Sequence, residues 1–260
     1  RDEEHSTRGR ANTLRLALSG RFGADALASE TVQDVFDLCV SCKGCRRECP
    51  TGVDMAKMKI EALHQRQRAH GLPLRARLIA HLPRWAPWAA RVPWLANLRD
   101  TLPGAAKVSE AWLGFSAQRA LPAWRRDTFL RSVVTARDEA ASANADVVLF
   151  VDTFTNYFEP GNAHAAVNVL RAAGFRVQVA RADGADAEPS RPLCCGRTYL
   201  AAGLVDEAKN EARRVVAALL PHVERGAALV GLEPSCLLSL RDEFLVMGLG
   251  DAAQRLSESA

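Results

Sequence analysis

The sequence lacks the features of several large functional classes. No apolar run approaches the roughly 18 residues that a membrane-spanning helix needs. No glycine-rich phosphate loop follows a predicted strand, so we expect no flavin or nicotinamide site within these residues. No Ser/His/Asp set or paired carboxylate cluster suggests hydrolysis. The formal net charge of +4 is small for 260 residues, and no nucleic-acid-binding module accompanies it, so we expect no nucleic acid partner.

Seven cysteines are present, and this odd number favours metal ligands over a disulfide framework. A hydrophobic content of 48% is typical of a globular protein, and the length suits one large or two ordinary domains. The sequence begins at Arg1 and shows no export signal. We therefore expect a cytoplasmic protein, with a peripheral position at the inner membrane as a further expectation, and a chain that is part of a longer one.

Four of the cysteines follow the C-x2-C-x2-C-x3-C-P spacing of bacterial ferredoxins. They are Cys39, Cys42, Cys45 and Cys49, followed by Pro50. This spacing predicts a [4Fe–4S] cluster, because three thiolates can wrap one side of a cubane while the fourth arrives from the next segment. Basic residues between the cysteines favour the thiolate form. The alternative is a structural zinc site, since two C-x2-C pairs also suit zinc.

The fourth cysteine of this motif leaves one assignment open. In two-cluster ferredoxins, it binds the cluster of the other motif rather than its own. This chain contains a single such motif. Cys49 therefore either completes the cluster of its own loop or serves a second motif that lies outside this sequence.

The composition predicts an α/β protein in three regions. Residues 1–70 form an all-α, ferredoxin-like domain with helices at 7–18, 31–38 and 53–68. In the last two helices, Leu38 and Met58 are expected on the buried face. Residues 71–145 form a connector of short helical pieces that Pro83, Pro87 and Pro93 interrupt. Residues 146–260 form an α/β domain.

The connector contains all five tryptophans of the chain. Between residues 71 and 127 it also has nine basic and three acidic residues. Aromatic and basic residues together occur at anionic lipid surfaces, which would give a peripheral membrane contact. We favour ordinary packing, with arginine stems on indole faces, because the prolines prevent one long amphipathic helix. The tryptophans are Trp85, Trp88, Trp94, Trp112 and Trp124.

The last region alternates strands with helices. Residues 147–151 are an unbroken apolar run, as expected for a strand buried on both faces. Further strands are predicted at 175–180 and 227–232, with helices at 162–173, 205–220 and 236–244. Strand, helix and strand in this order predict a parallel sheet.

A second group of cysteines falls in this region. Cys194, Cys195 and Cys236 each lie where a predicted loop meets a helix. Free backbone N–H groups at such junctions favour a thiolate or an anionic cluster. Adjacent cysteines can contact different irons of one cluster, so we expect a second iron–sulfur site here. The alternative is three unrelated buried cysteines.

These residues carry a family resemblance. The segments Leu193-Cys194-Cys195-Gly196-Arg197 and Glu233-Pro234-Ser235-Cys236 resemble one repeat of the cysteine-rich CCG domain. That domain occurs in heterodisulfide reductase, in the iron–sulfur subunit of glycolate oxidase and in anaerobic glycerol-3-phosphate dehydrogenase. The segment 151–161 resembles the opening of the repeat. Residues 3–12 resemble a narrower group of fused flavoproteins similar to D-lactate and D-2-hydroxyglutarate dehydrogenases.

The sequence departs from the family pattern in three ways. A first ferredoxin motif is absent upstream of residues 6–10. Thr153 stands where the repeat usually has a cysteine, so one expected cluster ligand is missing. One CCG repeat is present where two are usual. These departures imply a fragment and put in doubt whether Cys194, Cys195 and Cys236 hold a complete cluster.

The resemblance implies an electron-transfer function. The chain would be the iron–sulfur part of a 2-hydroxyacid dehydrogenase whose FAD lies outside these residues, in a fused domain or a separate subunit. Electrons would pass from the flavin through [4Fe–4S] to a quinone or another acceptor. One alternative is a stand-alone iron–sulfur subunit of a glycolate- or glycerol-3-phosphate-oxidising complex. Another, of a different class, is a zinc-stabilised interaction module.

Overall fold

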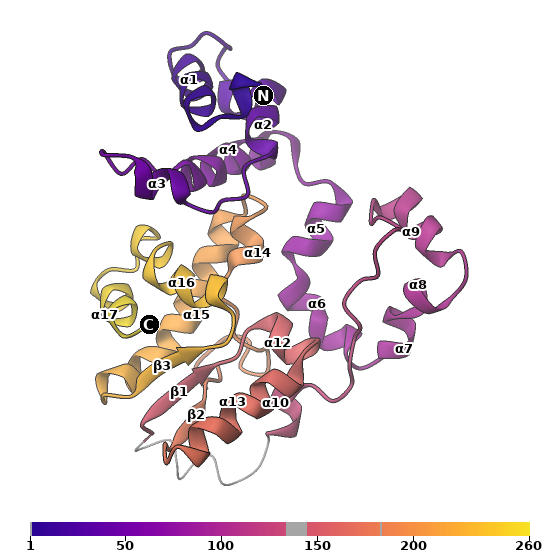
Figure 1. The fold of residues 1–260 in the computed structure, drawn as a ribbon, viewed down its shortest axis with the longest axis vertical. Helices are drawn as coiled ribbons and strands as arrows, with labels where there is room; N and C mark the ends of the chain where they lie inside the picture. Colours follow the sequence, from indigo (N-terminus) through magenta and orange to yellow (C-terminus); the bar gives the residue numbers. More distant parts are fainter. Residues whose placement is uncertain (1, 134–144, 183) are drawn as a thin grey trace. The chain divides into compact units, whose positions relative to one another are not determined.

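The computed structural model describes residues 2–133, 145–182 and 184–260. The chain forms two compact units (Figure 1), one made of residues 1–80 and 198–205 and the other of residues 81–197 and 206–260. The first unit is therefore discontinuous in sequence. No helix in the described ranges is both long enough and apolar enough to cross a membrane.

The first unit contains only helices and loops among its described residues. Its elements are η1 (Glu3–His5), α1 (Thr7–Leu18), η2 (Ala26–Ala28), α2 (Glu30–Asp37), α3 (Gly44–Glu48), α4 (Met55–His70) and α5 (Leu74–Ala80). The short helix α14 (Arg197–Leu200) begins the segment that returns to this unit. The three helices predicted here from the sequence correspond to α1, α2 and α4.

Side-chain caps explain where these helices begin. Ser6 accepts a hydrogen bond from the Gly9 N–H, and Ser29 caps α2 in the same way. Asp54 accepts from two backbone N–H groups at the start of α4. Such caps satisfy donors that the first helical turn leaves unpaired, and each contributes about 1 kcal/mol.

The core of this unit is small and aliphatic, centred on α2. Val32, Val35 and Phe36 are almost fully buried there, and Ala62 of α4 packs against them. Two expectations for this core were wrong. Leu38 is 65% exposed because it follows the last turn of α2, and Met58 is 38% exposed because α4 buries its alanines instead.

The second unit combines helices with one small sheet. Its elements before the sheet are α6 (Leu82–Ala89), α7 (Pro93–Ala96), α8 (Leu98–Thr101), α9 (Ala105–Leu113) and α10 (Phe129–Ser132). The strands are β1 (Val147–Phe150), β2 (Val177–Val179) and β3 (Ala228–Gly231). The remaining helices are α12 (Thr153–Tyr157), α13 (Pro160–Ala172), α15 (Val205–Glu224), α16 (Pro234–Arg241), η3 (Phe244–Val246) and α17 (Asp251–Ser259).

The sheet is parallel with the strand order β2-β1-β3. Val147 of β1 pairs with Val177 on one side and with Ala228 on the other. All four residues of β1 are buried, as expected for a central strand covered on both faces. The sequence prediction of an α/β fold with a parallel sheet is therefore confirmed at this level.

Helix α13 packs on the sheet beside β2 (Figure 1), and its Ala163 and Val167 share one apolar cluster with Leu149 of β1 and Phe129 of α10. Helix α16 lies next to β3. The apolar residues of β1 and β2 thus pack against α10, which precedes β1 in the sequence, and against α13, which lies between β1 and β2.

The tryptophans of the connector divide into two groups. Trp85 and Trp124 pack together with ring centroids 5.1 Å apart, and the Arg91 guanidinium lies 4.4 Å from the centre of the Trp88 ring. Trp88, Trp94 and Trp112 are nevertheless largely exposed.

Prolines interrupt the helices of the connector less than expected, because Pro87 lies inside α6 and Pro83 lies in its first turn.

Candidate functional site

The four-cysteine motif occupies one loop and the short helix α3. Cys39 follows the end of α2, Cys45 lies in α3, and Cys49 caps the C-terminal end of α3. Cys42 lies in the loop and is exposed, while the other three are partly buried. All four are free thiols, so the segment brings four sulfur donors together within eleven residues of chain.

The backbone of this loop is bent at two places that side chains rarely tolerate. Ser41 and Lys43 have φ angles of 56° and 60°, and they are the only non-glycine residues with positive φ among the described residues. A non-glycine residue in this left-handed region costs about 1–3 kcal/mol. Such strain concentrates at functional sites, where the surrounding structure holds an unfavourable conformation in place.

A lysine from α4 fixes the start of the loop. Lys59 Nζ lies 2.8 Å from the carbonyl oxygen of Phe36 and 2.7 Å from that of Cys39, and it donates to both. Cys39 and Cys45 pack against the apolar core of the unit. Lys59 thus joins the end of α2 to α4. Sequence reasoning missed this residue because its partners are backbone carbonyls about 20 positions away.

The surroundings of Cys49 favour its thiolate. A hydrogen bond with the Thr51 hydroxyl, with Sγ and Oγ1 3.2 Å apart, lowers the pKa of Cys49, and backbone N–H groups of Val53 and Thr51 add to this effect. Arg46 lies 3.8 Å from the Asp54 carboxylate that caps α4. A thiolate is the form that binds iron or zinc.

The spacing of the sulfurs bears on the kind of metal site. Within the described parts of the chain, no three cysteine sulfurs lie within 4.8 Å of one another. In a tetrahedral zinc site with Zn–S bonds of about 2.3 Å, the sulfurs would lie about 3.8 Å apart. The four thiols therefore do not form a closed zinc tetrahedron in this structure.

The second cysteine group comes together in the other unit. Cys195 Sγ and Cys236 Sγ lie 3.0 Å apart, although 41 positions separate them in sequence. Cys194 Sγ accepts a hydrogen bond from the Gly196 N–H. Cys236 lies in the first turn of α16, where Glu233 is the N-cap. All three side chains are buried.

Steric contacts explain why a glycine follows the cysteine pair. Gly196 has a φ of +79°, and a Cβ atom there would lie 3.1 Å from the carbonyl oxygen of Ala208 in α15. Only glycine accommodates both the left-handed backbone and this close approach. The Cys-Cys-Gly sequence thus lets the cysteine pair lie directly against α15.

The surroundings of Cys194 and Cys195 keep both thiols protonated in the metal-free protein. The hydrogen bond with Cys195 and the loss of solvent raise the pKa of Cys194 well above its ordinary value. For Cys195, the hydrogen bond with Cys194 lowers the pKa, but the contact with Cys236 and burial outweigh it, so that pKa is also raised. Cys194 and Cys195 therefore differ from Cys49, whose surroundings favour the thiolate.

A buried ionic network supports the loop before the cysteine pair. The Glu211 carboxylate on α15 binds Arg191 at 2.7 Å and Arg214 at 2.9 Å. Arg214 also binds Asp186 at 2.6 Å. Glu211 is 1% exposed, so this network costs much desolvation and fixes the loop to α15. No sequence pattern indicated it, because the partners come from distant segments.

Thr153, which replaces the cysteine expected from the resemblance, is buried and begins α12 directly after β1. Cys39, Cys42, Cys45 and Cys49 all belong to the first unit, and Cys194, Cys195 and Cys236 to the second. Four of the seven cysteines therefore belong to one unit and three to the other, and their grouping into metal sites remains a prediction.

Comparisons with known proteins point to dehydrogenases. The chain is 25% identical to the D-2-hydroxyglutarate dehydrogenase of Escherichia coli (strain K12), over 83% of this chain and 21% of that protein. It is 25% identical to the enzyme of the same name from Pseudomonas putida (strain KT2440), over 94% of this chain and 27% of that protein.

A third relative is a subunit of the anaerobic glycerol-3-phosphate dehydrogenase of Escherichia coli (strain K12), with 26% identity over 58% of this chain and 36% of that protein. No protein-family model and no solved structure matches the chain. The chain spans between about a fifth and about a third of the length of these curated relatives. In sequence, it is therefore similar to parts of proteins named as dehydrogenases.

Proposed function

We propose that the chain is the iron–sulfur electron-transfer part of a larger flavin-linked dehydrogenase. The observation that carries this proposal is the loop of four free thiols, Cys39, Cys42, Cys45 and Cys49, at ferredoxin spacing with two left-handed non-glycine residues between them. The similarity to dehydrogenases supports an oxidoreductase function.

The residues around the loop have defined tasks in this proposal. When bound, a [4Fe–4S] cluster supplies one-electron transfer, and the protein sets its position and potential. Lys59 holds the Cys39 backbone, and the core contacts of Cys39 and Cys45 exclude water from one side. Thr51 favours the Cys49 thiolate. Partial burial and hydrogen bonds to sulfur are the features that tune such a potential.

We further propose that Cys49 completes the cluster of its own loop. Its backbone N–H donates to the Cys45 carbonyl at 3.0 Å, so a single turn of α3 connects the two residues. This direct connection supports a shared cluster. The alternative assignment would require a second motif outside these residues.

Cys194, Cys195 and Cys236 are proposed as a second iron–sulfur site, but the residues fit a complete cluster poorly. They supply three thiols, and Thr153 stands where the resemblance expects the fourth. The 3.0 Å contact between two of the sulfurs is also closer than ligands of different irons would lie. We therefore assign no electron path to this group.

Our proposal for the rest of the enzyme draws on the relatives. Two of them are named D-2-hydroxyglutarate dehydrogenase, so we propose a 2-hydroxyacid as substrate, oxidised at an FAD on a fused domain or separate subunit. Electrons would leave to a quinone or another acceptor. The similarity to one part of a glycerol-3-phosphate dehydrogenase complex supports the stand-alone subunit as the second candidate. The gene sequence upstream of Arg1 separates the two, since a fused flavin domain would rule out the stand-alone form.

A peripheral membrane contact is part of the same proposal. Trp88, Trp94 and Trp112 are exposed within the basic connector, and exposed aromatic and basic residues together suit an anionic lipid surface. Sedimentation with phosphatidylserine vesicles tests this contact. Binding at low salt that the triple Trp-to-Ala variant loses would support it, and equal sedimentation with and without vesicles would contradict it.

The cluster assignment is tested by replacing Cys42, the most accessible ligand. Cys42→Ser and Cys42→Ala should abolish the electron paramagnetic resonance signal of a reduced cubane, because three thiolates no longer hold it securely. Ser41→Ala, at the adjacent position, serves as the matched control and should keep the signal. Circular dichroism establishes that each variant is folded. A signal that survives unchanged in folded Cys42→Ala would contradict the assignment.

A further inference from the structure

The second unit contains a cavity of about 370 Å³ at the carboxyl ends of two parallel strands. Ala180 and Arg181 follow β2, and Asn156 and Tyr157 belong to the helix that follows β1. The loop 189–193 closes another side. Ligands of parallel α/β sheets bind at the carboxyl ends of the strands, and pockets of this volume suit small metabolites.

The cavity lining is strongly basic. Among the described residues, it contains four arginines, Arg91, Arg131, Arg181 and Arg191, and neither aspartate nor glutamate. Arg191 already binds Glu188 and Glu211. No carboxylate of the described residues lies within 4.0 Å of the guanidinium nitrogens of the other three. Three positive charges around the cavity therefore lack an acidic partner within the described part of the chain.

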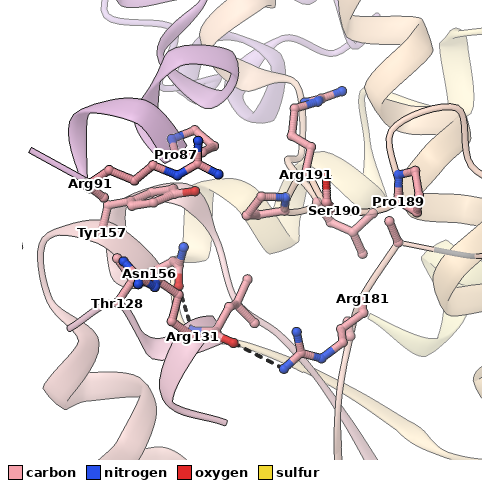
Figure 2. Close-up of a pocket in the computed structure, with 16 residues that line it drawn as sticks. Pro87, Arg91, Thr128, Arg131, Asn156, Tyr157, Arg181, Pro189, Ser190 and Arg191 are labelled. Atoms are coloured by element: carbon pink, nitrogen blue, oxygen red, sulfur yellow. Dashed lines mark hydrogen bonds between the residues drawn. The ribbon is translucent and has the colours of Figure 1, made fainter. Parts of the chain in front are cut away.

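Neutral hydrogen-bonding groups complete the lining. Figure 2 shows Arg91 and Tyr157 on one side of the cavity, with Arg181 and Ser190 on the opposite side. Burial raises the pKa of Tyr157 to about 12, so its hydroxyl remains a donor at neutral pH. Asn156 Oδ1 accepts a hydrogen bond from the Leu130 N–H at 2.9 Å, which holds α10 against this wall.

We propose that this cavity binds a small organic anion with at least two negative charges on carboxylate or phosphate groups. Guanidinium groups match both oxyanions, because their paired N–H donors can bind two oxygens at once. Arg181 and Arg91 approach from opposite sides, so one ligand with two charged ends, or one phosphate between them, would satisfy both. This site is independent of the proposed cluster and of the flavin chemistry.

Isothermal titration of the whole 260-residue chain tests the proposal with two probes, inorganic phosphate and succinate, at constant ionic strength. We expect a Kd below about 1 mM for at least one of them. Arg91→Gln and Arg181→Gln should each weaken binding by about tenfold, since each removes a charge-assisted hydrogen bond. Both side chains are exposed, so the variants should fold as the parent does.

Two controls make the result decisive. Arg171→Gln removes the same charge from an exposed position of α13 outside the cavity and should leave the Kd unchanged. Dimethyl succinate, which is neutral, should not bind. Preference for phosphate or for succinate identifies the ligand class. Absence of binding for both probes at about 10 mM, or equal weakening by Arg171→Gln, would overturn the proposal.

Discussion

The surroundings of Cys49 and those of the buried pair Cys194 and Cys195 favour different protonation states of the sulfur. At Cys49, a threonine hydroxyl and backbone N–H groups favour negative charge. At Cys194 and Cys195, burial and neighbouring sulfurs disfavour it. A metal that binds Cys194 and Cys195 must therefore displace protons from buried thiols, whereas Cys49 is closer to its metal-binding form.

The close sulfur pair predicts a specific oxidation product. In metal-free protein, the thiol oxidant diamide should link Cys195 to Cys236, because their sulfurs are already 3.0 Å apart. The two thiols lose two electrons and two protons to diamide, which becomes a hydrazine. Cys194 should remain a thiol, since adjacent cysteines pair poorly. Mass spectrometry of peptides from alkylated protein measures the products. Dominant linkage through Cys194 would contradict this arrangement.

The surroundings of Gly203 predict that one added methyl group, as in Gly203→Ala, destabilises the fold. It has a φ of +76°, and a Cβ atom there would lie 2.4 Å from the Leu63 carbonyl carbon in α4. Gly23 in the same unit has a φ of +88° with nothing in reach. Gly203→Ala should therefore reduce the free energy of unfolding by about 1–3 kcal/mol more than Gly23→Ala does. Urea unfolding measures both, and equal costs would show that the close approach is absent.

Residue patterns predicted the burial of Val32, Val35 and Phe36, but they did not predict every core residue correctly. Leu38 was expected inside and lies outside, because the helical periodicity ended one residue earlier than the hydrophobic pattern suggested. Lys59 and Glu211 resembled ordinary helix charges in the sequence. Their roles depend on carbonyls and arginines that only the folded chain brings near them.

At the scale of elements, the predicted helices and strands of residues 147–241 were confirmed within a few positions. The pattern was clear because β1 is unbroken and apolar, and because Gly174 and Pro234 mark a helix end and a helix start. The connector was harder to predict. Pro87 lies inside α6, where its missing N–H and fixed φ usually end a helix.

One ion pair joins the starts of two strands and predicts a pH dependence. Asp146 precedes β1 and accepts from Arg176 Nε at 2.9 Å and Nη2 at 2.6 Å, and Arg176 precedes β2. These hydrogen bonds lower the pKa of Asp146 to about 2. Since the folded pKa lies below that of the unfolded chain, the stabilisation is full above about pH 4 and is lost as the pH falls toward 2.

The experiment compares urea midpoints of the parent and of Asp146→Asn at several pH values. The advantage of the parent should be largest near neutral pH and should shrink below about pH 4. Arg176→Gln should lower the urea midpoint by about as much as Asp146→Asn does. The double variant should have a midpoint only slightly below that of either single variant. A parent advantage that stays constant down to about pH 2 would show that this pair does not contribute.

At the scale of the whole molecule, the division into units was not visible in the sequence. Composition suggested breaks near residues 70 and 145, and this division remains a prediction. In the structure, residues 198–205 join the first unit although the sheet lies before and after them in sequence. A contact such as that of His64 Nδ1 with the Gly203 carbonyl, at 2.8 Å, spans 139 positions and leaves no local pattern.

The relatives show how much of a known protein this chain matches. It covers about a fifth to a third of each of the three, so in sequence it is similar to one part of each. Within the described residues, the four-cysteine loop is the feature that connects this part to redox chemistry. The central claim is therefore that Cys39, Cys42, Cys45 and Cys49 hold an iron–sulfur cluster.

Quantification of iron, acid-labile sulfide and zinc in the anaerobically purified chain tests that claim most directly. We predict iron and sulfide in equal amounts, with at least about four of each per chain and no stoichiometric zinc. Stoichiometric zinc without sulfide would contradict it, and would make the four-cysteine loop a structural metal site.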